Sequence, residues 1–189
     1  MILRNTTRRY GSLSVALHWL IVLQLIAVYA CINLTDFFPE NSDPRQALLM
    51  WHYMLGLSVL AVAVLRVANR LSGPVPAALP GIPRWQNAVA SVTHLALYAL
   101  LLAMPVLGWL TLSASGQTIP FFGATLPPLI GPDKTLAHQI KKIHETLGVV
   151  GYYLIGLHVA AALFHHYLRR DGTLQRMLPF LRSKDKVGA

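Results

Sequence analysis

The sequence predicts an all-α integral membrane protein, a four-helix bundle that forms one membrane domain over residues 1–189. Hydrophobic residues make up 54% of the chain and charged residues only 12%, about half the charged fraction of a typical soluble domain. The apolar residues gather in four blocks of roughly 20 residues, the length that crosses a hydrocarbon core of about 30 Å. We therefore expect a multi-pass protein surrounded by membrane lipid.

The four blocks define predicted spans at about residues 13–34, 48–67, 88–112 and 143–168. Each span must be helical, because lipid offers no partner for free backbone groups. The first block is too long for the apolar region of a signal peptide, so we expect it to remain as a membrane helix. Pro105 lies inside the third block and is expected to kink that helix.

Glycines inside the spans allow close approach of helices or of a cofactor, and ordinary helix packing explains them equally well. They are Gly56, Gly108, Gly148, Gly151 and Gly156.

Two of the predicted connections are long, and loops of such length are uncommon without a function. The second connection, about residues 68–87, is rich in proline and is expected to be extended. The third, about residues 113–142, is expected to lie outside the membrane on the opposite side. Its segment Lys134–Lys142 has the composition of a short helix lying on the surface.

Lysine and arginine flank the apolar blocks, so the net charge of +9 does not indicate a nucleic-acid partner. Most of them lie in the N-terminal tail, the second connection and the C-terminal tail: Arg4, Arg8, Arg9, Arg66, Arg70, Arg84, Arg169, Arg170, Arg176, Arg182, Lys184 and Lys186. The first and third connections hold only Arg45, Lys134, Lys141 and Lys142. The positive-inside rule then places both termini in the cytoplasm. In a bacterium this is an inner-membrane protein whose other side faces the periplasm.

Histidines occur in or at the edge of every predicted span, where ionisable groups are rare and usually functional. His18 and His158 lie toward the cytoplasmic side, whereas His52 and His144 lie toward the external side. His144 and His158 are 14 residues apart in the sequence. On one helix this spacing returns them to within about 40° of the same face and separates them by about 21 Å along the axis. The four histidines therefore form two pairs at different depths.

This arrangement suits two stacked haems, each held between histidines of two helices, because imidazole is a good axial ligand for haem iron. A transition-metal path usually recruits carboxylates or thiolates as well. The chain has one cysteine, Cys31, which excludes an internal disulfide and a cysteine-ligated cluster, and Glu145, at the edge of the fourth span, is the one acidic residue within a predicted span. Haem is favoured, while a proton relay, a transporter and structural histidines remain alternatives.

Five segments resemble the bacterial cytochrome b561 family, and the resemblance covers about residues 10–177. They are Ser14–Trp19 (SVALHW), Met50–Gly56 (MWHYMLG), Met104–Gly108 (MPVLG), Ile143–Leu147 (IHETL) and Gly156–His166 (GLHVAAALFHH). The resemblance implies an inner-membrane cytochrome with two haem b groups that exchanges electrons with ubiquinone. It also implies His18 and His158 as ligands of the cytoplasmic-side haem, and His52 and His144 as ligands of the periplasmic-side haem.

Within the family, the chain resembles the stand-alone superoxide oxidase, which implies transfer of electrons from periplasmic superoxide to ubiquinone. Lys134, Lys141 and Lys142 break the positive-inside trend, and a cationic mouth would attract the superoxide anion. Phosphate headgroups or a haem propionate explain these lysines equally well. The alternative function is a cytochrome b subunit that links a periplasmic redox protein to the quinone pool, and a homo-oligomer is compatible with either.

Cationic residues and histidines at the cytoplasmic end are candidates for binding haem propionates or a quinone carbonyl: Arg8, Arg9, Arg66, His165 and His166. Arg66 could equally extend its side chain to the headgroups. His94 lies at about the depth of His18. It is expected either to compete as a ligand or to support packing or a propionate.

Overall fold

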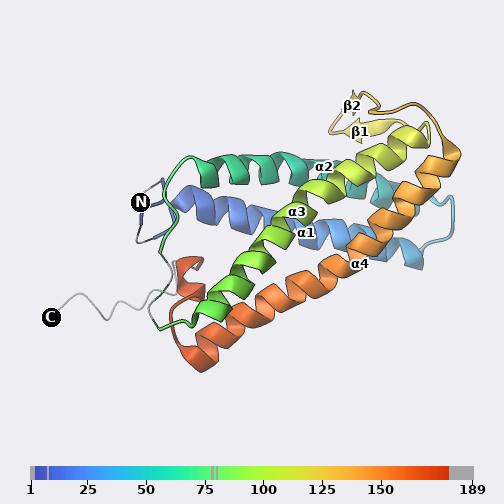
Figure 1. The fold of residues 1–189 in the computed structure, drawn as a ribbon. Helices are drawn as coiled ribbons and strands as arrows, with labels where there is room; N and C mark the ends of the chain where they lie inside the picture. The colour runs from blue at the N-terminus through green and yellow to red at the C-terminus, as the bar shows by residue number, and fades with distance from the viewer. Residues whose placement is uncertain (1–2, 8, 78, 80, 179–189) are drawn as a thin grey trace.

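The structure is a computed structural model that describes residues 3–7, 9–77, 79 and 81–178. Four long helices dominate this part of the chain (Figure 1). They are α1 (Ser12–Leu34), α2 (Asp43–Leu71), α3 (Arg84–Ala114) and α4 (Lys134–Phe164). Each is long and apolar enough to cross a membrane, which confirms the predicted fold class.

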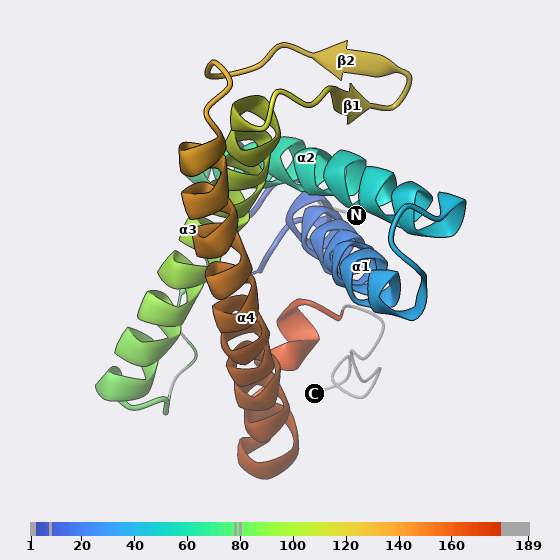
Figure 2. The same ribbon diagram turned by 90° about the vertical axis from the view of Figure 1, so that its right-hand side faces the viewer.

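The helices pack in chain order, α1 on α2, α2 on α3, and α3 on α4 (Figures 1 and 2). Helices α1 and α4 close the circle mainly through side chains. Tyr29 of α1 donates a hydrogen bond of 2.9 Å to the Gly148 carbonyl, and Asn33 donates one of 2.5 Å to the Tyr152 hydroxyl.

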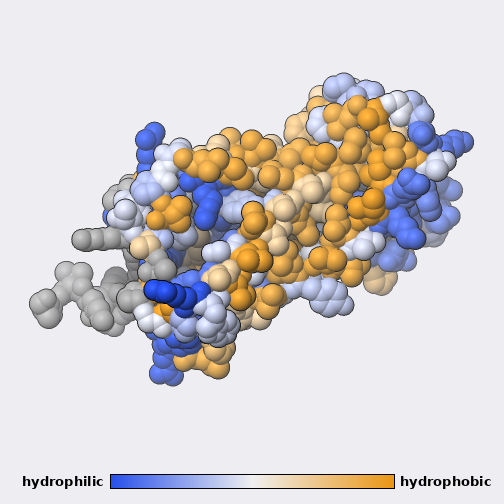
Figure 3. Space-filling model, viewed as in Figure 1, coloured by the Kyte–Doolittle hydropathy of each residue, from blue (hydrophilic) through white to orange (hydrophobic). Residues whose placement is uncertain are grey.

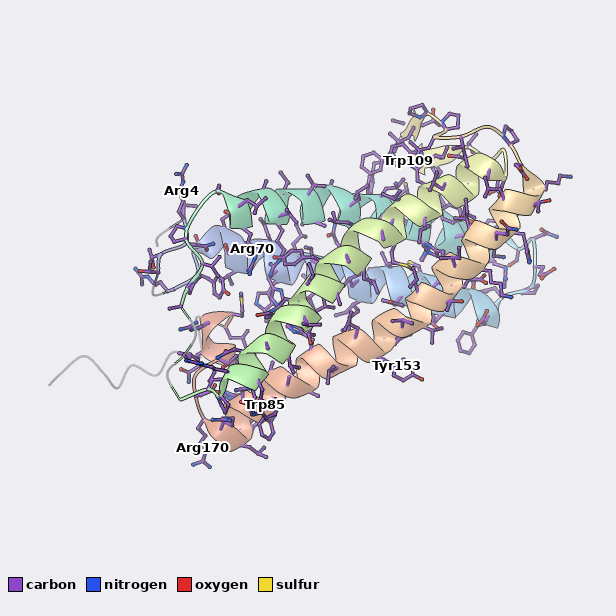
Figure 4. The ribbon with its side chains drawn as sticks, viewed as in Figure 1. Arg4, Arg70, Trp85, Trp109, Tyr153 and Arg170 are labelled. Atoms are coloured by element: carbon purple, nitrogen blue, oxygen red, sulfur yellow. The ribbon has the colours of Figure 1, made fainter. Side chains whose placement is uncertain are left out.

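The two ends of the bundle differ, and we name them by their structures. The tail end carries the segment before α1 and the segment after α4, whereas the hairpin end carries two short strands, β1 (Ile119–Phe121) and β2 (Ala124–Leu126) (Figure 1). Arg4, Arg70 and Arg170 lie at the tail end, and Trp109 lies at the hairpin end (Figure 4). The charge bias found in the sequence therefore corresponds to one physical end of the molecule.

The outer surface is that of a protein in lipid. An apolar band covers the middle of the bundle, and polar residues gather at its two ends (Figure 3). Tyr153 points away from the bundle (Figure 4) and is 76% exposed. The buried core is small by comparison, with one cluster formed by Ile21, Val59, Ala63 and Leu101. Apolar surface of this extent is stable only when lipid covers it.

Helix α4 begins earlier than the sequence predicts. Asp133 caps it, since its carboxylate accepts hydrogen bonds from the backbone N–H groups of Thr135 (2.9 Å) and Leu136 (3.0 Å). The expectation of a separate surface helix at Lys134–Lys142 is therefore wrong, because this segment forms the first turns of α4 itself. The same helix therefore continues from this polar segment into the apolar span.

Helices α2 and α3 also exceed the predicted spans at both ends. Helix α3 continues through Pro105 as one element.

The hairpin is an element that the sequence does not predict. Phe122 and Gly123 join its strands and both have positive φ angles, 45° and 88°, as a type I′ turn requires. The Phe122 N–H points to the Met54 sulfur at 3.3 Å, and Ile119 is 2% exposed against Leu57 and Leu112. The hairpin thus closes its end of the bundle over α2 and α3.

At the tail end, the chain folds back under the helices. Helix α4 runs into a π-helical turn, His165–Arg169, and Arg170 reverses the chain with a φ of 53°. The short helical turn Leu174–Arg176 follows, and the Met177 carbonyl accepts a hydrogen bond of 2.8 Å from the Trp19 indole. The returning segment therefore closes the tail end beneath the start of α1.

Candidate functional site

The hairpin-end histidine pair joins α2 to α4. The rings of His52 and His144 lie 6.3 Å apart between centroids, with an angle of 80° between their planes. The Val28 carbonyl lies 3.0 Å from His52 Nδ1. A carbonyl can only accept a hydrogen bond, so this nitrogen carries the proton and Nε2 keeps its lone pair. Such a partner fixes the tautomer and orientation that a metal-binding histidine needs.

The tail-end pair joins α1 to α4. The rings of His18 and His158 also lie 6.3 Å apart, with an angle of 76°. His94 of α3 lies beside the same pair, with its centroid 5.4 Å from that of His158. The structure therefore brings together the two pairs expected from the sequence, and it adds a third histidine at one of them.

These separations fit an iron held between two imidazoles. A metal–imidazole bond is about 2.0 Å long and the nitrogen lies about 1.15 Å from the ring centroid, so opposed ligands have centroids about 6.3 Å apart. Both predicted pairs have this separation. His94 and His158 are too close to each other to bind opposite sides of one iron. His18 is the better partner for His158.

Glycines lie beside both histidines of the hairpin-end pair. A Cβ atom placed on Gly108 would lie 3.4 Å from the Cε1 atom of His144, so α3 passes close to this ring because residue 108 lacks a side chain. His144 Nδ1 is buried beside the Met104 carbonyl but makes no hydrogen bond of normal geometry there. A Cβ on Gly56, one turn from His52, would meet no atom within 4 Å. The hairpin-end pair thus borders space that side chains do not fill.

Arg66 of α2 lies inside the tail end of the bundle. Its Nη1 donates to the Ser14 carbonyl of α1 and its Nε donates to the Tyr98 hydroxyl of α3, both at 3.2 Å. Ser14 is one helical turn from His18, and Tyr98 is one turn from His94. The half-buried guanidinium is therefore bound between α1 and α3, one helical turn from His18 and from His94.

Sequence reasoning missed the side chains that hold Arg66. Tyr98 also faces Arg70, whose guanidinium carbon lies 5.9 Å from the ring centroid. Asn69 donates to the Ser14 hydroxyl at 2.7 Å. Their only sequence signal is polarity inside or beside an apolar block, and this signal does not reveal a partner on another helix.

The other candidates at the tail end lie farther from the histidine pair. Arg9 is exposed in the segment before α1, and Arg8 lies outside the described residues. His166 packs against its neighbour Tyr167, with ring centroids 4.8 Å apart. Within the described residues, no hydrogen bond or ring contact joins His165 or His166 to His18 or His158.

His165 instead bonds to Asp171 through Nδ1 and a carboxylate oxygen. Burial alone would raise the pKa of Asp171, but hydrogen bonds from His165 and Thr173 outweigh burial and hold this pKa below its ordinary value. The contact fastens the returning tail to the end of α4.

The external lysines lie at the hairpin end. Lys134 and Lys141 line a surface hollow of about 240 Å³ between α3 and α4, together with Thr111, Ser115, Ala137 and His138. Lys141 also forms an exposed ion pair with Glu145, with 3.7 Å between Nζ and Oε1. Lys142 is exposed and is not part of the lining. The hollow is one turn outward from His144 along α4.

Comparison with known proteins gives a consistent result across the chain. Residues 9–180 match the sequence model of a family described as prokaryotic cytochrome b561. The chain is 36% identical over 171 residues to cytochrome b561 homolog 1 of Escherichia coli (strain K12), covering 90% of this chain and 97% of that protein. It is 32% identical over 172 residues to the probable superoxide oxidase CybB of Yersinia pestis, covering 91% and 97%. It is 31% identical over 182 residues to cytochrome b561 homolog 2 of E. coli, covering 94% and 95%.

Proposed function

Since this chain belongs to the prokaryotic cytochrome b561 family of membrane electron-transfer proteins, which implies b-type haem, we propose that it is a superoxide:ubiquinone oxidoreductase. Two haem b groups would serve it as one-electron carriers. Two superoxide anions each lose one electron and leave as oxygen, and ubiquinone takes up both electrons with two protons. The relative named as a probable superoxide oxidase supports this choice of donor.

The observation that carries the proposal is the equal separation of the two histidine pairs, 6.3 Å in each. His18 and His158 would hold one haem, and His52 and His144 the other. Haem iron bound by two histidines exchanges single electrons and has no open position for oxygen. The chain's own contribution is to fix each imidazole, as the Val28 carbonyl does for His52, and to keep water away from both pairs.

We place the superoxide-facing surface at the hairpin end. The hollow there carries Lys134, Lys141 and His138 and lies beside the helix turn that leads to His144. Positive charge beside a low-dielectric protein raises the local concentration of an anion and its encounter rate. Lys142 adds charge at the same end without lining the hollow.

We place the ubiquinone site at the tail end, which the positive-inside rule assigns to the cytoplasmic face of the bacterial inner membrane. A π-helical turn inside or at the end of an α-helix often marks a functional site, and here it contains His165 and His166. His166 is half-buried and has no hydrogen-bond partner among the described residues, so it is the better candidate to bind a quinone carbonyl. His165 already bonds to Asp171.

The test is the decay of superoxide generated outside vesicles that contain the purified haem-loaded protein and ubiquinone. The proposal expects decay faster than in vesicles with haem-free protein, accompanied by ubiquinone reduction. The double variant Lys134→Gln/Lys141→Gln should slow this decay up to about tenfold at low salt and less at high salt, because steering is screened. Arg45→Gln is the matched control, since Arg45 belongs to the same end but binds the Thr35 carbonyl at 2.7 Å.

Equal decay with and without haem would reject the superoxide proposal. If a soluble redox protein that co-purifies with the chain reduced its haem instead, the function would be that of an electron-transfer subunit. Colourless protein after haem-replete expression would reject both functions.

A further inference from the structure

The two histidine pairs have the same spacing but different electrostatic surroundings. At the tail end, the Arg66 guanidinium is anchored to Ser14 of α1 and Tyr98 of α3 by bonds of 3.2 Å. It lies close enough to His18, His94 and His158 to act on all three electrostatically. Arg70 adds a second cation that acts on His94 and faces Tyr98 from 5.9 Å.

No carboxylate of the described residues offsets these cations. Asp171, an acidic residue at this end, is engaged by His165 and Thr173, and it is not among the groups that act on His18, His94 and His158. Arg66 has no ion pair in the part of the chain that the structure describes. A half-buried, unpaired guanidinium inside a membrane bundle is costly, so its position calls for a negative group that is bound there.

The hairpin-end pair has a different environment. Apart from its partner His52, the group that acts electrostatically on His144 is the carboxylate of Glu145, its neighbour in sequence. Lys141 lies 3.7 Å from Glu145, but both side chains are more than 60% exposed, so water screens the pair. Among the described residues, no lysine or arginine side chain acts on either histidine of this pair, so it lacks the cation that the tail-end pair has.

Adding an electron to a bound haem adds one negative charge to its site. A cation inside the low-dielectric bundle stabilises that added charge, and a carboxylate opposes it. We infer that Arg66, assisted by Arg70, makes the tail-end centre the one of higher reduction potential, so that electrons run downhill from the hairpin end to the tail end. This inference rests on the proposed binding of two haems, and it supplies the direction of transfer that the ligands alone leave open.

Arg66 is a positioning residue in this proposal. It acts through the electric field of its guanidinium on the tail-end haem site and does not itself take part in electron transfer. The effect depends on charge more than on hydrogen bonds. Lysine at this position should therefore preserve most of the potential, whereas glutamine, which keeps hydrogen-bonding ability and removes the charge, should not.

The experiment is an optical redox titration of the purified holoprotein. Wild type is compared with Arg66→Gln, Arg66→Lys and Arg70→Gln, and Arg45→Gln is the control cation at the hairpin end. His52→Ala removes the hairpin-end centre and so identifies which potential belongs to which pair. The expected result is a higher potential for the tail-end centre in wild type and a clear downward shift of that centre alone in Arg66→Gln. Arg70→Gln should shift it less, and Arg66→Lys and Arg45→Gln should leave it near the wild-type value.

A hairpin-end centre of higher potential in wild type would overturn the inference, as would equal shifts of both centres in Arg66→Gln. If Arg66→Gln fails to retain haem, Arg70→Gln and Arg66→Lys still test whether positive charge sets the potential of the tail-end centre. An unshifted tail-end centre in Arg70→Gln together with a large drop in Arg66→Lys would show that charge is not the cause. These outcomes assume that two haems are bound, whereas failure to bind haem in wild type would contradict the proposed function instead.

Discussion

The tail end and the hairpin end hold the same pair of side chains at the same distance, yet little else about them is alike. At the hairpin end, a backbone carbonyl orients His52, and no lysine or arginine of the part of the chain that the structure describes acts on the pair. At the tail end, a third histidine and Arg66 converge on the pair. The geometry of both pairs suits the same kind of iron ligation, and we propose different roles for them because their surroundings differ.

The two ends are also closed by different means. Near the hairpin end, the Tyr29 ring of α1 contacts the Tyr152 ring of α4, with centroids 4.3 Å apart and an angle of 42° between the ring planes. At the tail end, the returning segment lies beneath the bundle and is held by the contact of Trp19 with Met177 and by the contact of His165 with Asp171. Side-chain contacts between two helices thus join α1 to α4 near one end, and a short docked segment lies beneath the bundle at the other.

The largest expected effect is on haem content, and it distinguishes the proposed ligands from His94. His158→Ala should remove the tail-end haem and leave the hairpin-end haem, halving the haem-to-protein ratio. His94→Ala should keep the full ratio, because His94 lies only 5.4 Å from His158 and is too close to be its opposed partner. The haem content of the purified variants decides between these outcomes. Loss of one haem in His94→Ala with retention in His18→Ala would reverse the assignment.

A smaller effect is expected where α1 meets α4. A Cβ atom at residue 151 would collide with the Tyr29 hydroxyl, which donates to the Gly148 carbonyl. Gly151→Ala should therefore lower the thermal stability, by about 1 kcal/mol, the low end of overpacking costs, since a tyrosine side chain can shift. Gly156→Ala is the matched control, because a Cβ there meets no atom within 4 Å. Equal melting temperatures for the two variants would exclude a close α1–α4 contact.

The smallest effect concerns the docked segment at the tail end. The folded pKa of Asp171 lies below its ordinary value of about 3.9. The ionised carboxylate of Asp171 therefore stabilises the docked segment fully at pH values above the ordinary pKa. This stabilisation is lost as the pH falls through the lower pKa of the folded state. Hydrogen exchange in residues 171–178, corrected for the intrinsic rate, should rise in acid, while the hairpin should not change. Asp171→Asn should show faster exchange already at neutral pH. An acid-induced rise of the same size in this variant would show that another group is responsible.

The four helices were predictable because the apolar blocks are long enough to cross a membrane. In lipid, unpaired backbone groups are so costly that such a block must be helical. The sequence predicted the pairing of His18 with His158, and of His52 with His144, because depth in a membrane follows from position along a helix. The start of α4 was misjudged because Lys134–Lys142 is polar, and polarity ends a membrane span without ending a helix.

Other features depend on contacts that no local pattern encodes. Tyr98 and Ser14 lie 32 and 52 residues from Arg66 in the sequence, so the anchoring of its guanidinium inside the bundle was not predictable. The hairpin was missed because its turn uses Phe122 at a positive φ, where asparagine or aspartate would have been the usual signal. The difference between the two ends therefore emerges only when the helices are assembled.

The most direct test of the central claim is an optical spectrum recorded through a redox titration of the wild-type holoprotein beside His52→Ala and His18→Ala. Two separable b-type centres in wild type are expected. His52→Ala should lose only the lower-potential centre and His18→Ala only the higher-potential one. A single centre in wild type, or both centres retained after either substitution, would contradict the account of two histidine clamps at opposite ends of the bundle.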